Sequence, residues 1–273
     1  MKLEIFNVEH GQCSLITTAE GGRILIDCGH NATSGWTPTK HFVGNEFKEL
    51  DRLFITNSDE DHASDLHNLR DAIRIRSLSR NPTVKSSNIF QLKSQDVGRG
   101  IRALCDMLDT YTHPLSENAK IDHIRYKSFY NRYPTDFEDE NDLSVVTFFD
   151  LGSLRIAFTG DMTRAGFLKL LERAEFKEYL SGTAVYVASH HGRQDGCCPE
   201  MFGDGLLNPV VTIISDGGKQ YASQETVDWY AHRTLGFNYG DTTRKVLTTR
   251  KDGNIAFRFG TDGKASVDLN VAF

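Results

Sequence analysis

An acidic loop directly after a short apolar run imposes the strongest constraint on how this chain folds. The apolar run 53–55 is typical of a buried strand, and the chain turns abruptly polar after it. Asp59, Asp61 and His62 follow within a few positions, and apolar residues then recur at helical spacing over 66–73. The sequence therefore predicts a strand, a tight loop and a helix, and α/β proteins place their chemistry on such loops.

Carboxylate and imidazole together are the ligands that a hard or borderline dication takes. Glu60 adds a further acid to the loop, and carboxylates this close repel one another unless a cation or wide solvent exposure offsets their charge. A simpler interpretation is a solvated acidic loop in which Asp61 or Asp65 caps the following helix. The loop alone leaves both interpretations open.

Two more groups with metal-ligand chemistry come directly after predicted strands. The strand 154–158 leads to Asp161, and the strand 184–188 leads to a pair of histidines. Taken singly, Asp161 is explained as a helix cap, and the pair as one core and one exposed imidazole. Strand ends at one edge of a sheet converge in space, so we expect these regions to meet around one or two metal ions. The candidate ligands are Asp59, Asp61, His62, Asp161, His190 and His191.

The remaining pattern predicts one large domain over residues 1–273. Short strands at 2–8, 13–17 and 23–27 form a meander, and a helix is expected at 44–50. Residues 80–141 have too little apolar content for a core of their own, although a helix is expected at 101–108. We interpret 80–141 as a family-variable, partly helical insertion.

Charge and composition narrow the class of protein. The net charge is −6 and no block of Lys or Arg stands out, which argues against tight non-specific binding to nucleic acid. No apolar run approaches the roughly 20 residues of a membrane span, and the first residues lack the apolar region of a signal peptide. Five cysteines without a CxxC spacing indicate reduced, structural thiols. We expect a cytoplasmic protein.

Six short motifs in register resemble the metallo-β-lactamase superfamily, and within it the hydrolase domain of ComEC-type competence proteins. They resemble that subfamily's "VGQGD", "LIDTG", "HxDxDH", "NxxSLV", "TGD" and "HHGS", and stand at residues 6–12, 24–29, 56–62, 141–146, 159–161 and 189–192. Order and spacing match over nearly the whole chain outside 80–141.

The resemblance implies an αββα sandwich of class α/β (α+β), with two mixed sheets face to face, helices outside and a two-metal site at one edge. It implies that Asp61 and His62 hold one Zn or Mn ion, that Asp161 bridges to a second, and that Asp59 sits with that other ion. One of His190 and His191 would complete a shell. Asp61, His62 and Asp161 would be the catalytic residues.

Two departures from the motif set bear on the site. Asn57 stands where the superfamily has its first histidine, and an amide is a much weaker ligand than an imidazole. Ser223 stands where the subfamily has a late histidine. His10, on the first turn, is a candidate for supplying a missing imidazole, and Asn57 remains a weak accessory candidate.

Three functions follow as hypotheses. The first is a metal-dependent phosphodiesterase or nuclease acting through a metal-activated water, with nucleic acid or a nucleotide as substrate. The second is a hydrolase of a small ester, amide or cyclic nucleotide, which the acidic charge favours. The third is a degenerate member that binds without catalysis, which Asn57 and Ser223 favour. ComEC-like hydrolase domains normally follow membrane spans, so we also expect a protein partner encoded beside this chain.

Overall fold

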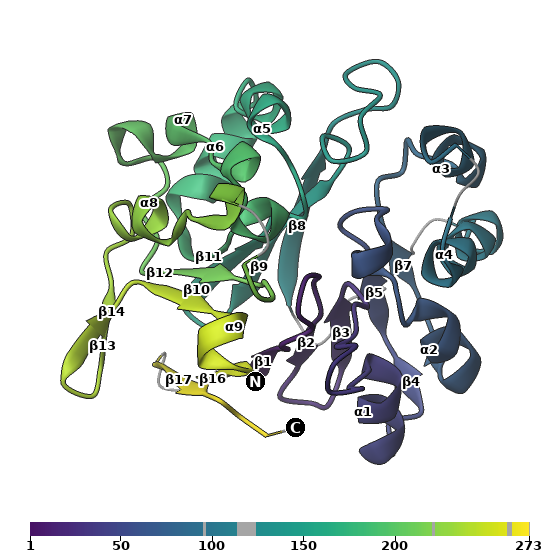
Figure 1. Cartoon of the computed structure of the whole chain (residues 1–273), viewed down its shortest axis with the longest axis horizontal. Coiled ribbons are helices and arrows are strands. Elements are labelled where there is room, and N and C mark those ends of the chain that lie inside the picture. Colours follow the sequence, from purple (N-terminus) through teal and green to yellow (C-terminus); the bar gives the residue numbers. More distant parts are fainter. Residues whose placement is uncertain (95–96, 114–123, 220–221, 261–263, 273) are drawn as a thin grey trace.

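Two β-sheets lie face to face in this protein, and helices cover the outer face of each (Figure 1). The computed structural model describes residues 1–94, 97–113, 124–219, 222–260 and 264–272. The first sheet runs in the order β17 (Ala265–Leu269), β16 (Ile255–Phe259), β1 (Lys2–Ile5), β2 (Ser14–Thr17), β3 (Arg23–Ile26), β5 (Arg52–Phe54) and β7 (Leu78–Ser79). The second runs in the order β15 (Val246–Thr248), β12 (Val211–Ile214), β11 (Thr183–Val187), β10 (Leu154–Phe158), β9 (Val145–Leu151) and β8 (Arg125–Tyr130).

Helices and short elements complete the layers. Over the first sheet lie α1 (Pro38–Gly44), α2 (Leu66–Ala72), α3 (Ser86–Leu92) and α4 (Arg99–Thr110). Over the second lie α5 (Arg164–Leu170), α6 (Ala174–Ser181), α7 (Pro199–Phe202) and α8 (Val227–Ala231), and α9 (Thr249–Asp252) follows β15. Short strands are β4 (Glu49–Leu50), β6 (Arg74–Ile75), β13 (Phe237–Tyr239) and β14 (Thr242–Arg244). Single turns of 3-10 helix are η1 (Glu60–His62), η2 (Ser189–Gly192), η3 (Gln194–Gly196), η4 (Gly203–Gly205) and η5 (Ala222–Gln224).

Three apolar cores separate these four layers. Alternate residues of a strand point to opposite faces of its sheet, so Ile24 and Ile26 of β3 face the second sheet whereas Leu25 faces the helices. The core between the sheets joins such residues to Phe149 and Ile156 of the second sheet. Both sheets contain parallel and antiparallel pairs. The predicted αββα sandwich of two mixed sheets is confirmed.

The segment 80–141 is built into this sandwich. Helix α4 contains the predicted helix 101–108 and packs against α2, and its Ile101 and Leu104 belong to the core beneath the first sheet. Strand β8 pairs with β9 at the edge of the second sheet. Residues 95–96 and 114–123 of the segment lie outside the described residues. The family-variable character of 80–141 stays a prediction.

The helix expected at 44–50 is wrong in position. Helix α1 ends at Gly44, and β4 occupies the end of the expected range. Thr37 caps α1 by accepting a hydrogen bond from the backbone N–H of Lys40, and Pro38 fits the first turn, where its missing N–H is not needed. The Thr-Pro pair therefore starts this helix at Pro38, earlier than expected.

All five cysteines are buried and none forms a disulfide. Within the described part of the chain, no helix combines the length and the apolar character needed to cross a membrane.

Candidate metal centre

The loop after β5 carries three of the predicted ligands. Asp61 and His62 lie in the single turn η1, and Asp59 immediately precedes that turn. The backbone of Asp61 packs directly against two glycines. A Cβ on Gly11 would lie 2.6 Å from the Asp61 carbonyl oxygen, and a Cβ on Gly29 would lie 2.5 Å from it. Close packing of bare backbone therefore fixes where the Asp61 side chain starts.

The second sheet supplies the other three predicted ligands from neighbouring strand ends. Asp161 follows β10, and its backbone N–H donates to the hydroxyl of Ser144 at 3.1 Å. His190 and His191 follow β11 with φ angles of 50° and 51°, a left-handed conformation that non-glycine residues rarely adopt. This turn aims the two imidazoles in different directions, and the N–H of His190 donates to the Gly160 carbonyl at 3.0 Å.

These side chains meet at one edge of the sandwich. His62 Nε2 lies 3.0 Å from Asp161 Oδ1, and His191 Nε2 lies 3.2 Å from Asp61 Oδ2 and 3.5 Å from Asp161 Oδ1. His10 stands further out, with its Nε2 3.9 Å from Asp61 Oδ2. Two overlapping groups have ligand atoms within 4.8 Å of one another, namely His62 with Asp161 and His191, and His10 with Asp61 and His191.

A further contact behind each imidazole sets its orientation. His62 Nδ1 lies 2.9 Å from Asp27 Oδ2, and Asp27 is itself fixed by the backbone N–H and the hydroxyl of Thr56. His191 Nδ1 lies 2.9 Å from the Ser215 carbonyl oxygen, which can only accept, so Nδ1 carries a proton. Partners of this kind fix the tautomer and ring position of metal-binding histidines.

Charge in this cluster is strongly coupled. Burial opposes ionisation of Asp61, but contact with His191 and the charge of His62 lower its pKa to about 2. Burial also opposes a charge on His62, yet Asp161 and Asp27 raise its pKa well above the ordinary value. The pKa of His191 is raised in the same way, against burial, by Asp161 and Asp61. The carboxylates therefore demand a positive charge among them.

A divalent cation fits that demand. His191 Nε2 is buried and lies close to two carboxylate oxygens. When the imidazole is neutral and keeps its proton on Nδ1, the lone pair of Nε2 faces both oxygens. Two acceptors and a lone pair pointed at one another repel unless a proton or a cation lies between them. Imidazole and carboxylate donors on three separate strand ends are a donor set that zinc or manganese accepts.

Comparison with known protein families agrees with this donor set. The model of the metallo-β-lactamase superfamily matches residues 7–195, which include every gathered ligand. This chain belongs to the metallo-β-lactamase superfamily. No curated protein matches it.

Several solved structures are similar to this superfamily member at low identity. Igni18, a metallo hydrolase from Ignicoccus hospitalis, is 14% identical over 95% of this chain and 100% of its own, with a TM-score of 0.47. The metallo-β-lactamase fold protein YhfI from Bacillus subtilis is 11% identical over 91% and 96%, with a TM-score of 0.45. Zn²⁺-bound PqqB from Methylobacterium extorquens is 13% identical over 68% and 72%, with a TM-score of 0.40.

Not every predicted ligand of this metallo-β-lactamase-superfamily chain joins the cluster. Asp59 Oδ1 lies 2.5 Å from the ammonium of Lys93, and Asp59 belongs to neither group of converging ligand atoms among the described residues. His190 Nδ1 instead lies 2.9 Å from Asp195 Oδ1. Of the two histidines, the structure therefore brings His191 to the carboxylates and turns His190 away.

The two accessory candidates have other partners as well. Asn57 donates to the side chain of Asn141 at 3.1 Å and accepts from the backbone N–H of Asp59 at 3.0 Å, so its amide shapes the loop. His10 accepts from Arg193 Nη2 at 3.1 Å, and burial together with the charge of His191 lowers the pKa of His10 to about 4. His10 is therefore a neutral imidazole at the border of the cluster.

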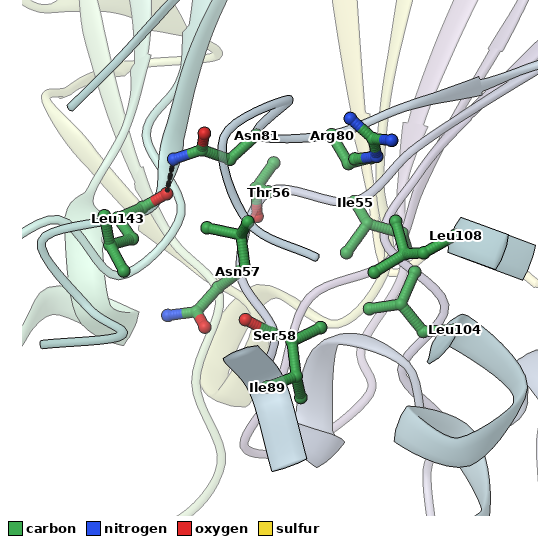
Figure 2. A pocket seen from close by; sticks show the side chains of 11 residues that line it. Ile55, Thr56, Asn57, Ser58, Arg80, Asn81, Ile89, Leu104, Leu108 and Leu143 are labelled. Carbon is green, nitrogen blue, oxygen red and sulfur yellow. Dashed lines mark hydrogen bonds between the residues drawn. The ribbon is translucent and has the colours of Figure 1, made fainter. Parts of the chain in front are cut away.

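Three hollows adjoin the loop, and the smallest, of about 10 Å³, lies in the cluster itself and is lined by His62, Asp161 and His191. Figure 2 shows a second one, where Asn57 and Ser58 face the apolar side chains of Ile89 and Leu104, and where Asn81 donates to the Leu143 carbonyl. Its volume of about 30 Å³ suits water rather than a substrate. The third hollow, of about 570 Å³, is lined by His10 and Asp61 among other residues and is of a size that takes small molecules. Substrate access to the cluster is therefore expected from the His10 side.

The sequence reasoning missed three contributors. Asp27 ends the third strand, and that position, a buried carboxylate where a strand stops, was a usable signal. Arg193 and Lys93 gave none, because their roles depend on contacts across the fold.

Proposed function

We propose that this protein is a metal-dependent hydrolase of phosphodiester bonds. The observation that carries the proposal is the position of the buried His191 Nε2, which faces the carboxylates of Asp61 and Asp161 at 3.2 and 3.5 Å. Asp61, His62, Asp161 and His191 are the residues that would hold the ion. A zinc or manganese ion in such a site supplies Lewis-acid chemistry and an activated water.

The protein's own groups prepare the site for that ion. Asp27 holds the ring of His62 and raises the basicity of the nitrogen that faces Asp161, and the Ser215 carbonyl keeps the proton of His191 on Nδ1. Both histidines are at least 97% buried, so they keep their orientation without a bound ligand. The donors are therefore arranged before metal and substrate arrive.

An anionic substrate is favoured by Arg193. Its guanidinium contacts His10 at 3.1 Å and His190 at 3.4 Å, and thus adds a fixed positive charge beside the cluster. Guanidinium groups bind phosphate oxygens well, whereas a neutral ester or amide gains little from such a charge. The likeness of the motif order to ComEC-type hydrolase domains supports the same substrate class, with nucleic acid or a nucleotide as the natural substrate.

Hydrolysis of two model substrates tests the proposal. Metal-free protein reloaded with Mn²⁺ or Zn²⁺ is expected to cleave bis(p-nitrophenyl) phosphate and to act far more slowly on p-nitrophenyl acetate. Asp161→Asn should abolish the phosphodiesterase activity, while Asp106→Asn, which removes an exposed carboxylate 69% accessible to solvent, should leave it intact. Full activity in Asp161→Asn contradicts the proposal. Failure of the unmodified protein to take up metal favours a non-catalytic binding function instead.

A further inference from the structure

A lysine contacts Asp59, the first acid of the loop. The ammonium of Lys93 lies 2.5 Å from Asp59 Oδ1 and 2.6 Å from Glu140 Oε2, and its side chain is only 12% exposed. Lys93 follows the last turn of α3, and Glu140 lies shortly before β9. Both therefore come from segment 80–141, which reaches over to hold Asp59 away from the metal cluster.

The lysine offsets a concentration of negative charge. Burial raises the pKa of Glu140 above the ordinary value of a glutamate, and the neighbouring Asp59 contributes to that rise. The carboxylates of Asp59 and Glu140 contact the same ammonium, so they lie close enough to repel each other without a cation between them. Here the chain supplies that cation itself. A monovalent ammonium with hydrogen-bonding protons fills the role without any bound ion.

The remaining donors suffice for one ion. Both groups of converging ligand atoms depend on His191 Nε2, which has one lone pair, and His191 Nδ1 is already used by Ser215. The lone pair of His10 Nε2 accepts from Arg193. That leaves the converging group of His62, Asp161 and His191, with Asp61 beside it, 3.2 Å from His191 Nε2. Three protein ligands with one position open for water are the number that a single catalytic ion uses.

We propose that this chain binds a single divalent ion, and that the ammonium of Lys93 takes the charge-balancing place beside Asp59 that a second ion would need. The inference rests on the metal site of the proposed function and replaces the two-ion site expected from the sequence. It gives the segment 80–141 a defined task, because Lys93 and Glu140 set the metal stoichiometry of the loop.

Counting metal ions per chain separates this inference from the function itself. Native mass spectrometry of the full chain, freed of metal and titrated with Zn²⁺ or Mn²⁺, should reach one ion and stop there. Asp59→Asn should also bind one, and His191→Ala should bind none. Two ions in the unmodified protein, reduced to one by Asp59→Asn, overturn the inference and leave the hydrolase proposal standing. No ion at all overturns both.

Removing the ammonium tests the role of Lys93 directly. Lys93→Met leaves the carboxylates of Asp59 and Glu140 facing each other, and should therefore gain a second, weaker ion. Lys93→Arg keeps the positive charge and should stay at one ion. The gain should disappear in the double variant Lys93→Met with Asp59→Asn. Circular dichroism shows whether Lys93→Met is folded, and the same titration counts its ions. If the folded variant still binds only one ion, the role of Lys93 is overturned.

Discussion

His62 Nε2 lies 3.0 Å from Asp161 Oδ1, although the two residues are 99 positions apart in the chain. His62 follows β5 of the first sheet, and Asp161 follows β10 of the second. Their contact therefore bridges the two layers of the sandwich at one edge. Because each residue sits directly beyond a buried strand, packing between the sheets fixes the geometry of the site.

Replacing Asp27 by asparagine should weaken metal binding without leaving a cavity in the protein interior. The variant keeps the size of the side chain but loses the charge that orients His62 across 2.9 Å. Loss of such a partner costs about 10- to 100-fold in metal affinity. Competition against a chromophoric chelator measures the effect, with Asp106→Asn as the control. An affinity equal to that of the unmodified protein would show that Asp27 serves the fold alone.

Metal binding should release protons at neutral pH. The pKa values of His62 and His191 are raised in the metal-free protein, because Asp161 and its carboxylate neighbours outweigh the opposing effect of burial. Metal requires neutral imidazoles, so affinity should rise with pH until both groups have lost their extra protons. Calorimetric titrations at pH 7 in buffers of different ionisation enthalpy measure the release. Identical heats in all buffers would contradict these shifts.

Gly29→Ala should destabilise the protein through the loop that carries Asp61. A Cβ at this position would lie 2.5 Å from the Asp61 carbonyl oxygen and 2.9 Å from that of Gln12, so the backbone must move. Overpacking of this kind lowers the free energy of unfolding by about 1–3 kcal/mol. Gly44→Ala is the matched control, since no atom lies within 4 Å of its Cβ position. Equal urea midpoints for the two variants would show that Gly29 is not closely packed against the backbone of Asp61.

Phe149→Ala should loosen the contact between the sheets. The ring of Phe149 is fully buried and packs edge-on against Phe54 and Phe158, which precede the two halves of the metal cluster. Truncating a buried phenylalanine lowers the free energy of unfolding by about 3–5 kcal/mol. Urea unfolding measures the loss, and Phe149→Leu should lose less. If Phe149→Ala lost less free energy of unfolding than Phe149→Leu, the ring would not contribute to packing between the sheets.

Strand ends were the part of the site that the sequence could reveal. Apolar runs that stop at Ile55 and Phe158, followed a few residues later by Asp61 and Asp161, are local features, and sheet geometry then brings the two carboxylates together. The choice between His190 and His191 depends on two left-handed φ angles that no residue pattern predicts. The cytoplasmic location, the protein partner and the nucleic-acid substrate stay predictions.

Contacts between residues far apart in the sequence explain why other candidate ligands do not join the cluster. Asp59 has the chemistry and the spacing of a ligand, but Lys93, which pairs with it, lies 34 residues further along, just after α3. Asn57 and His10 are likewise committed to Asn141 and Arg193. Side-chain contacts across separate elements decide which of several suitable residues face the cluster.

Anomalous diffraction from a crystal soaked with zinc tests the central claim most directly. The account predicts one strong peak per chain, within about 2.0–2.2 Å of His191 Nε2 and of a carboxylate oxygen of Asp61 or Asp161. A peak at Asp59 and Glu140 with none at His191, or no peak in the sandwich edge at all, would contradict it.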